Sequence, residues 1–148
     1  MRKSLLAMAV LVALPAFGAE VGLIKVSQGA ASIERAGKRV PATVGMAVEP
    51  SDVIVTAHDG AVGVTFTDNS VVSVGPDSVF AIDRYAFDTT TYAGQFDGTL
   101  SKGRLAAVSG KMVKQSPESM KIHTPSAVMG VRGTEFVVQV DEPATVAR

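Results

Sequence analysis

The fold class follows from residues 53–82, which read VIVTAHDGAVGVTFTDNSVVSVGPDSVFAI. Short runs of β-branched residues alternate here with clusters of turn formers such as Asp68-Asn69-Ser70. Successive runs are marked at steps of nine, nine and eight residues, by Val53, Val62, Val71 and Val79. This spacing favours an all-β protein: a single domain of short strands in two facing sheets or in a solenoid-like β arrangement.

Alternation within the runs predicts which side chains are buried. Val62, Val64 and Phe66 share one face of a strand, and Phe80 and Ile82 share a face of another, so we expect all five in the core. No window shows apolar residues at helical spacing, so no helix is expected. Further strands are expected at residues 21–27, 31–35, 38–40, 100–109, 111–113 and 136–140.

The first 18 residues have the layout of a secretory signal peptide. Arg2 and Lys3 precede an unbroken apolar run, Leu5–Leu14, and small residues follow up to Gly18. A run of this length is too short to span a bilayer, which needs about 20 apolar residues. We therefore predict cleavage near 18/19 and a β domain over residues 19–148. The protein would be exported to the periplasm without membrane insertion, or secreted if the host has a single membrane.

The composition argues against several classes of function. The 148 residues contain 14 Lys+Arg against 14 Asp+Glu, two histidines and no cysteine. Nucleic-acid binding needs a basic surface, which a balanced charge does not supply, and the lack of cysteine excludes disulfides, thiolate metal sites and thiol nucleophiles. We find no sequence motif for a catalytic centre, a phosphate-binding loop or a metal site. The expectation is a protein that is not an enzyme and needs no cofactor or metal.

An aromatic segment between residues 85 and 98 allows two interpretations. It contains Tyr85, Phe87, Tyr92 and Phe96, spaced a few residues apart among Thr, Gly and Asp. The side chains can pack over the core as an extended hairpin, or form an exposed strip that contacts a small molecule or a carbohydrate. Both interpretations remain open at this point.

The segment near the C-terminus combines two glycines with a charged pair. Gly130 and Gly133 permit a positive φ or a close backbone approach, which indicates a bulge or bend between strands. Arg132 lies between them, where Glu135 or another carboxylate can fix its guanidinium, or where it can contact an anion or a protein. Together with Thr134, these residues form the candidate partner-binding or structural motif.

Residues 124–136, TPSAVMGVRGTEF, resemble the signature of the FecR domain. Weaker upstream elements resemble the same family in the same order, at residues 44–56, 66–82 and 100–105. The resemblance implies an all-β extracytoplasmic module, which in its best-known setting passes an iron-uptake signal from an outer-membrane receptor to a cytoplasmic sigma factor. Residue 69 is Asn where the family often has Gly, and Asn also tolerates a left-handed turn.

This chain shows neither the cytoplasmic anti-sigma helices nor the transmembrane helix of that setting. We therefore expect a non-enzymatic binding, scaffold or signalling-accessory module of the cell envelope, whose partner is an envelope protein. An exposed sheet face or edge strand would make the contact. The alternative is a small-molecule or carbohydrate-binding domain that uses the aromatic segment.

Overall fold

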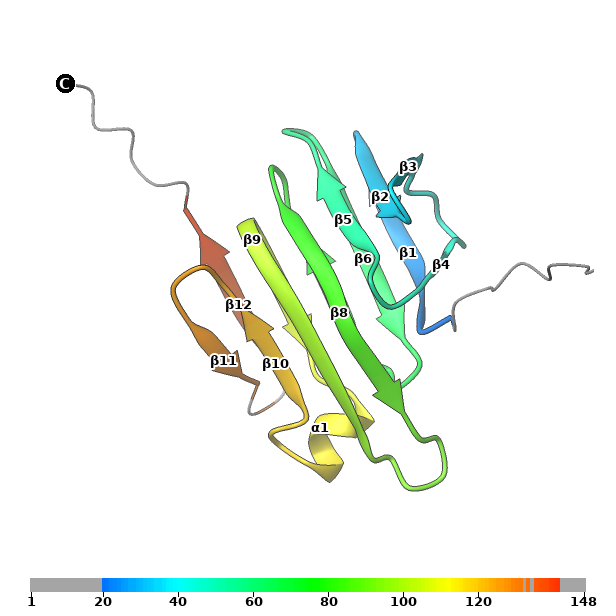
Figure 1. Ribbon diagram of the computed structural model, residues 1–148, viewed down its shortest axis with the longest axis vertical. Helices are drawn as coiled ribbons and strands as arrows, with labels where there is room; N and C mark the ends of the chain where they lie inside the picture. The colour runs from blue at the N-terminus through cyan, green and yellow to red at the C-terminus, as the bar shows by residue number, and fades with distance from the viewer. Residues whose placement is uncertain (1–19, 132, 134, 142–148) are drawn as a thin grey trace, which may run out of the picture.

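The computed structural model describes residues 20–131, 133 and 135–141, and nearly all of its regular secondary structure is β (Figure 1). The strands are β1 (Gly22–Gln28), β2 (Ala31–Arg35), β3 (Lys38–Pro41), β4 (Ala47–Val48), β5 (Val53–Thr56), β6 (Ala61–Phe66), β7 (Val71–Val74), β8 (Val79–Phe87), β9 (Gly94–Val108), β10 (Met120–His123), β11 (Val128–Gly130) and β12 (Glu135–Val140). A short helix, α1 (Lys111–Gln115), lies between β9 and β10. The predicted signal peptide, residues 1–18, lies outside the described residues.

The strands join into one curled sheet. Its main path runs β3-β2-β5-β8-β9-β7-β6-β1-β4, while β10 and β12 also pair with β9, and β11 pairs with β10. Neighbouring strands are antiparallel, apart from β9 and β10, which are parallel. The all-β expectation is thus confirmed. The arrangement as two separate facing sheets is not confirmed, because the pairing is continuous through β9.

The long strand β9 divides the sheet into two parts, which we call wings. Its first part pairs with β8 and β10, and these strands with β2, β3, β5 and β11 form wing one. Its last part pairs with β7 and β12, and these with β1, β4 and β6 form wing two. Gly103, where the pairing changes, has φ +95°, and a Cβ there would lie 2.0 Å from the Ser78 Oγ.

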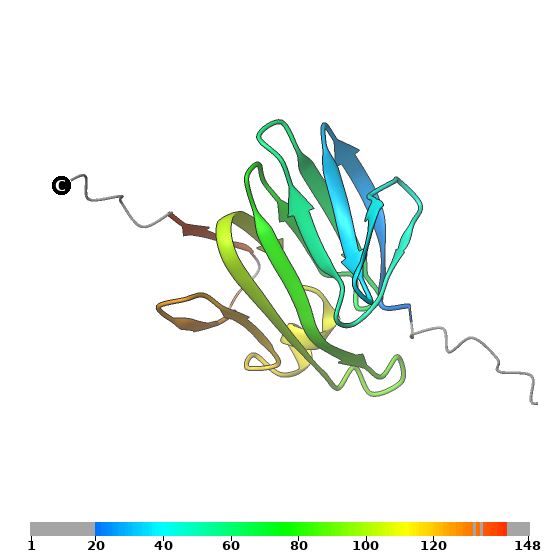
Figure 2. The same ribbon diagram turned by 45° about the horizontal axis from the view of Figure 1, so that its top comes forward.

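One core fills the space that the curl encloses (Figure 2). Side chains of both wings contribute to it, and the five predicted core residues are all buried. Aromatic rings join the wings directly: the Phe66 ring of β6 lies 5.2 Å from the Tyr85 ring of β8 and 4.9 Å from the Phe96 ring of β9, centroid to centroid. Such contacts add to the stabilisation that comes from burial.

The prediction of a strand over residues 111–113 is wrong, because this segment begins α1. Met112 and Val113 are both buried, whereas successive residues of a strand point to opposite faces. The topology supplies the reason. Parallel neighbours such as β9 and β10 need a crossover connection, and α1 is part of that connection. Over the described residues, the structure has no helix that is long and apolar enough to cross a membrane.

Candidate functional site

The segment at residues 124–136 begins with a tight hairpin at the outer end of wing one. The Thr124 amide donates to the Ala127 carbonyl over 2.8 Å, and the Ala127 amide donates to the Thr124 Oγ1 over 3.1 Å. The hairpin joins β10 to β11, which pairs with β10 alone among the described strands. The threonine therefore fixes the turn through its own side chain.

From β11 the chain crosses to wing two. Val131 is buried, and its amide donates to the Met120 carbonyl over 2.9 Å. Gly133 has φ +99°, and its carbonyl accepts a hydrogen bond from the Ser109 hydroxyl. The predicted bend is confirmed at Gly133. Gly130 is a residue of β11 that has neither a positive φ nor a neighbour within 4 Å of an added Cβ, so the expected left-handed backbone or close approach is not found at this glycine.

Two members of the predicted motif, Arg132 and Thr134, lie outside the described residues. Glu135 is exposed at the start of β12, opposite Val108 of β9. Further along β12, Phe136, Val138 and Val140 face the core side, as the alternation predicts.

An open groove of about 390 Å³ separates the hairpin of wing one from β12 of wing two. Its walls are polar at Thr124 and Gln139 and apolar at Met129, Val138 and Val140. In Figure 1, β11 and β12 (orange to red) lie next to the groove at the side of the molecule away from β1. Both strands have a single partner among the described residues, so each presents a free edge.

The free edges of the sheet differ in how far they resist pairing with another chain. β3 carries Lys38, Arg39 and Pro41, and β4 is two residues long. Basic residues, proline and short length all disfavour the addition of another strand, so both edges are protected against pairing with another chain. β11 is three residues long. β12 has six residues, EFVVQV, without lysine or proline. Among the described edges, β12 is therefore the best suited to accept an added strand.

The comparison with protein families decides the membership of the chain. The family described as FecR protein matches residues 52–148, which is more than half of the sequence. The chain belongs to the FecR family. This family is regulatory and related to signalling. A search of curated proteins finds no match, and a search of solved structures finds none either.

The aromatic segment of this FecR domain divides into a buried and a surface pair. Tyr85 and Phe96 lie in the core, 5.5 Å apart between ring centroids. Phe87 and Tyr92 stack near the β8–β9 turn at 6.1 Å, and the Lys111 ammonium lies 5.2 Å from the centre of the Tyr92 ring. The packing interpretation is thus confirmed for Tyr85 and Phe96. The four rings do not form one exposed strip.

A buried polar network in the FecR domain escaped the sequence prediction. The carboxylate of Asp68, which is fully buried, accepts from the Ser70 amide over 3.0 Å and from the Tyr85 hydroxyl over 3.0 Å. The Tyr85 hydroxyl also accepts from the Asp68 amide over 3.1 Å and lies 3.0 Å from the Thr67 Oγ1. Asn69, at φ +67°, completes the expected left-handed turn.

This environment changes the pKa of Tyr85. Burial of the phenol, opposed by the hydrogen bond with Thr67 and reinforced by the charge of Asp68, raises the pKa of Tyr85 to about 12. A neutral phenol therefore holds the β6–β7 turn of wing two to β8 of wing one. A weak signal for this arrangement is present in the sequence, because an Asp two residues before a Ser is typical of a turn.

A second unpredicted contact joins β2 to the segment before β5. The Arg35 guanidinium donates to both carboxylate oxygens of the buried Asp52, over 2.8 and 2.6 Å, and to the Ala47 carbonyl over 2.9 Å. The hydrogen bond to Asp52 raises the pKa of Arg35, although desolvation opposes the shift. Such a bidentate pair fixes the orientation of the side chain. Arg35 and Asp52 are 17 residues apart and form no recognisable sequence motif.

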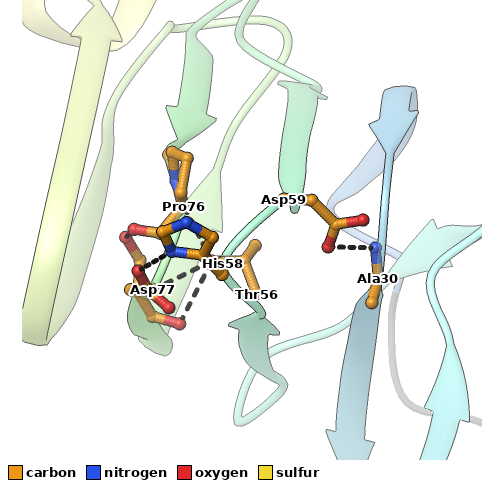
Figure 3. A network of polar contacts seen from close by, with 8 residues as sticks. Ala30, Thr56, His58, Asp59, Pro76 and Asp77 are labelled. Carbon is orange, nitrogen blue, oxygen red and sulfur yellow. Dashed lines mark hydrogen bonds and ion pairs between the residues drawn. The ribbon is translucent and has the colours of Figure 1, made fainter.

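The histidines occupy surface positions. Figure 3 shows His58, whose Nδ1 lies 3.1 Å from the Asp77 Oδ2, and Asp59, whose Oδ1 accepts from the Ala30 amide over 3.2 Å. These contacts join three of the turns that connect the wings. His123 Nε2 lies 3.8 Å from the Asp97 Oδ1 on wing one. Over the described part of the chain, no three His, Asp or Glu side chains gather in a way that could hold a metal ion.

Proposed function

We propose that this FecR-family protein is a non-enzymatic binding or signalling-accessory module of the cell envelope, and that it captures a partner protein by strand addition to β12. The observation that carries the proposal is the character of that edge. β12 is the longest free edge of the described sheet and lacks the lysine, arginine and proline that protect β3. Main-chain hydrogen bonds would supply the affinity of such a complex.

The groove beside β12 supports a choice of partner chemistry. Residues of an added strand that face the core side would lie next to Phe136, Val138 and Val140, over the apolar part of the groove. Residues that face outward would lie next to Glu135, Val137 and Gln139, which are exposed and polar except for Val137. An extended segment with alternating apolar and polar residues fits both sides.

A photo-crosslinking experiment tests strand addition to β12. A photoreactive amino acid replaces Gln139 on β12 or, as the control, Val44, which is 64% exposed and lies between β3 and β4. We expect a discrete adduct with an envelope protein from position 139 and not from position 44. Absence of an adduct at position 139 in repeated experiments, or the same adduct from both positions, would contradict the proposal.

Export to the periplasm is a further part of the proposal, supported by the sequence of residues 1–18. Expression of the full chain should yield a mature protein whose first residue is Ala19, recovered in the periplasmic fraction. Mass spectrometry of the intact protein measures the cleavage site. An unprocessed chain that retains Met1 in the cytoplasmic fraction would refute export.

The small-molecule or carbohydrate alternative has a narrower basis than the strand-addition proposal. Such a site would have to use Phe87 and Tyr92 without the other two aromatic residues, because Tyr85 and Phe96 are buried. We therefore retain protein binding as the conclusion.

A further inference from the structure

The outer surface of wing two carries most of the exposed large apolar side chains of the described chain. Five of these eight residues lie on this surface, where they span the strands from β1 to β12; we call this surface the wing-two face. They are Leu23, Val26, Val71, Val108 and Val137. Isolated exposed valines need no explanation, whereas a contiguous group of them marks an interaction surface.

The strand register shows that these side chains are neighbours. One row across the wing consists of Leu23, Thr65, Val71, Val108 and Glu135, and the next consists of Val26, Gly63, Ser73, Ala106 and Val137. Val26 lies over Gly63, because a Cβ added to that glycine would be 3.2 Å from the Val26 Cβ. In the second row the positions between the two valines are small: Gly63, Ser73 and Ala106.

Wing one has the opposite character. Its outer surface at β8, β9 and β10 carries polar side chains that bond to one another. The Thr99 hydroxyl donates to the Asp83 carboxylate, and the Gln95 amide donates to the Asp97 carboxylate over 2.8 Å. Of the eight exposed large apolar residues of the described chain, only Val128 lies on a strand of wing one, although Val53, Val55 and Val79 are partly exposed on its outer side.

We propose that the wing-two face packs against the same face of a second copy of this chain. Two sheets that pack face to face keep their strands nearly aligned, at about 30°. A two-fold axis along β7, the middle strand of the wing, then exchanges β6 with β9 and β1 with β12. Val71 meets its own counterpart on the axis, and Val26 meets Val137 of the second copy.

Charge complementarity at the two ends of the face favours this axis and a second copy as the occupant. Lys25 is exposed at the bulge of β1, between Leu23 and Val26, and Glu135 is exposed on β12 at the other end of the face. Rotation about β7 places the β1 end of one copy over the β12 end of the other. Glu135 then lies over Leu23 of the second copy, and Lys25, two residues further along β1, can reach the Glu135 carboxylate, twice in the dimer.

The size of the face sets the expected strength of the dimer. Five strands about 4.8 Å apart and three rows roughly 7 Å apart, the third row being the polar one that holds Arg104 and Gln139, give on the order of 500 Å² on each copy. This area is at the lower limit for a specific interface. We therefore expect a dimer that forms at micromolar or higher concentration rather than an obligate one.

Sedimentation equilibrium of the protein purified after expression of the full chain tests the proposal. The apparent mass should rise from that of the monomer near about 5 µM toward twice that value near about 500 µM. Val71→Lys places two ammonium groups on the axis and should weaken the dimer by at least about 20-fold. Val44→Lys, a substitution of similar chemistry off the face, should leave the dissociation constant unchanged. Circular dichroism verifies that each variant is folded.

Exchanging the charges of Lys25 and Glu135 tests the same dimer without substituting Val71. Lys25→Glu and Glu135→Lys should each weaken the dimer about fivefold, and the two substitutions together should restore it to within about twofold. A protein that remains monomeric at the highest concentration overturns the proposal, whether its face is covered by its own terminal residues or by a different protein. A dimer that is insensitive to Val71→Lys, or not restored by the double exchange, overturns it as well.

Discussion

The variant Tyr85→Phe removes a single oxygen atom from the core and tests whether the buried polar network stabilises the fold. Tyr85→Phe keeps the ring that packs against Phe66 and Phe96 but deletes the hydroxyl. That hydroxyl accepts from the Asp68 amide and donates to the Asp68 carboxylate. The carboxylate keeps its bonds from Ser70, whereas the amide loses its side-chain partner in a buried position.

The expected loss of stability follows from the Asp68 amide, which is left without its hydrogen-bond acceptor. A buried donor without an acceptor costs about 1–3 kcal/mol. For a chain of this length, about 3 °C of melting temperature corresponds to each kcal/mol, so Tyr85→Phe should melt about 3–9 °C below the natural protein. Tyr92→Phe removes the same atom from a tyrosine that is 41% exposed and should change the free energy of unfolding by less than about 0.5 kcal/mol.

The raised pKa of Tyr85 adds a pH dependence to this prediction. The pKa is about 12 in the folded protein and about 10 in an unfolded chain, so the folded state holds the phenolic proton more tightly. The contribution of the neutral phenol is fully present below about pH 10 and is lost as the pH rises toward about 12. The stability difference between the natural protein and Tyr85→Phe should therefore be constant near neutral pH and shrink over that alkaline range.

Urea titrations of the natural protein, Tyr85→Phe and Tyr92→Phe, at neutral pH and at several alkaline values, measure both effects. Two results would refute the reasoning. One is a Tyr85→Phe variant as stable as Tyr92→Phe at neutral pH. The other is a stability difference that does not change between about pH 9 and 12, which would mean that the hydroxyl does not titrate as a buried group.

Three further predictions concern backbone strain, a buried charge and the core. Gly133→Ala should destabilise by about 1–2 kcal/mol because of its φ of +99°, and Gly130→Ala by less than about 0.5 kcal/mol; equal urea midpoints would contradict this. Asp52→Asn, which weakens the pairing with Arg35, should cost about 1–3 kcal/mol, and an unchanged melting temperature would exclude a stabilising role for that pair. Leu100→Ala empties a fully buried position and should cost about 2–5 kcal/mol by calorimetry; a smaller loss would mean that the core collapses around the cavity.

The strands were predictable where alternation is local. Residues 53–82 carry their own period, so the four predicted marks, at residues 53, 62, 71 and 79, fall within one residue of the first residues of β5, β6, β7 and β8. The bend at Gly133 was also predictable, since few residues other than glycine adopt a φ of +99°. Both predictions depend on neighbours in the sequence.

The remaining features depend on contacts between distant segments. α1 follows from the parallel pairing of β10 with β9, which no local pattern encodes. The pairing of Arg35 with Asp52 and of Tyr85 with Asp68 spans 17 residues in each case. The free edge of β12 is visible only once the neighbours of every described strand are known. The candidate binding surface was therefore predictable as a segment but not as an edge.

The position of the N-terminal strands has a consequence for how the domain can be divided. The strands that precede residue 52 occupy both ends of the sheet path, with β2 and β3 beside β5 and with β1 and β4 beside β6. A fragment that starts at residue 52, where the family match begins, would leave β5 and β6 each with one of its two neighbours missing. Two new sheet edges would then be open to association with other chains. The unit that folds thus extends about thirty residues before the unit that the family defines, from β1 onward.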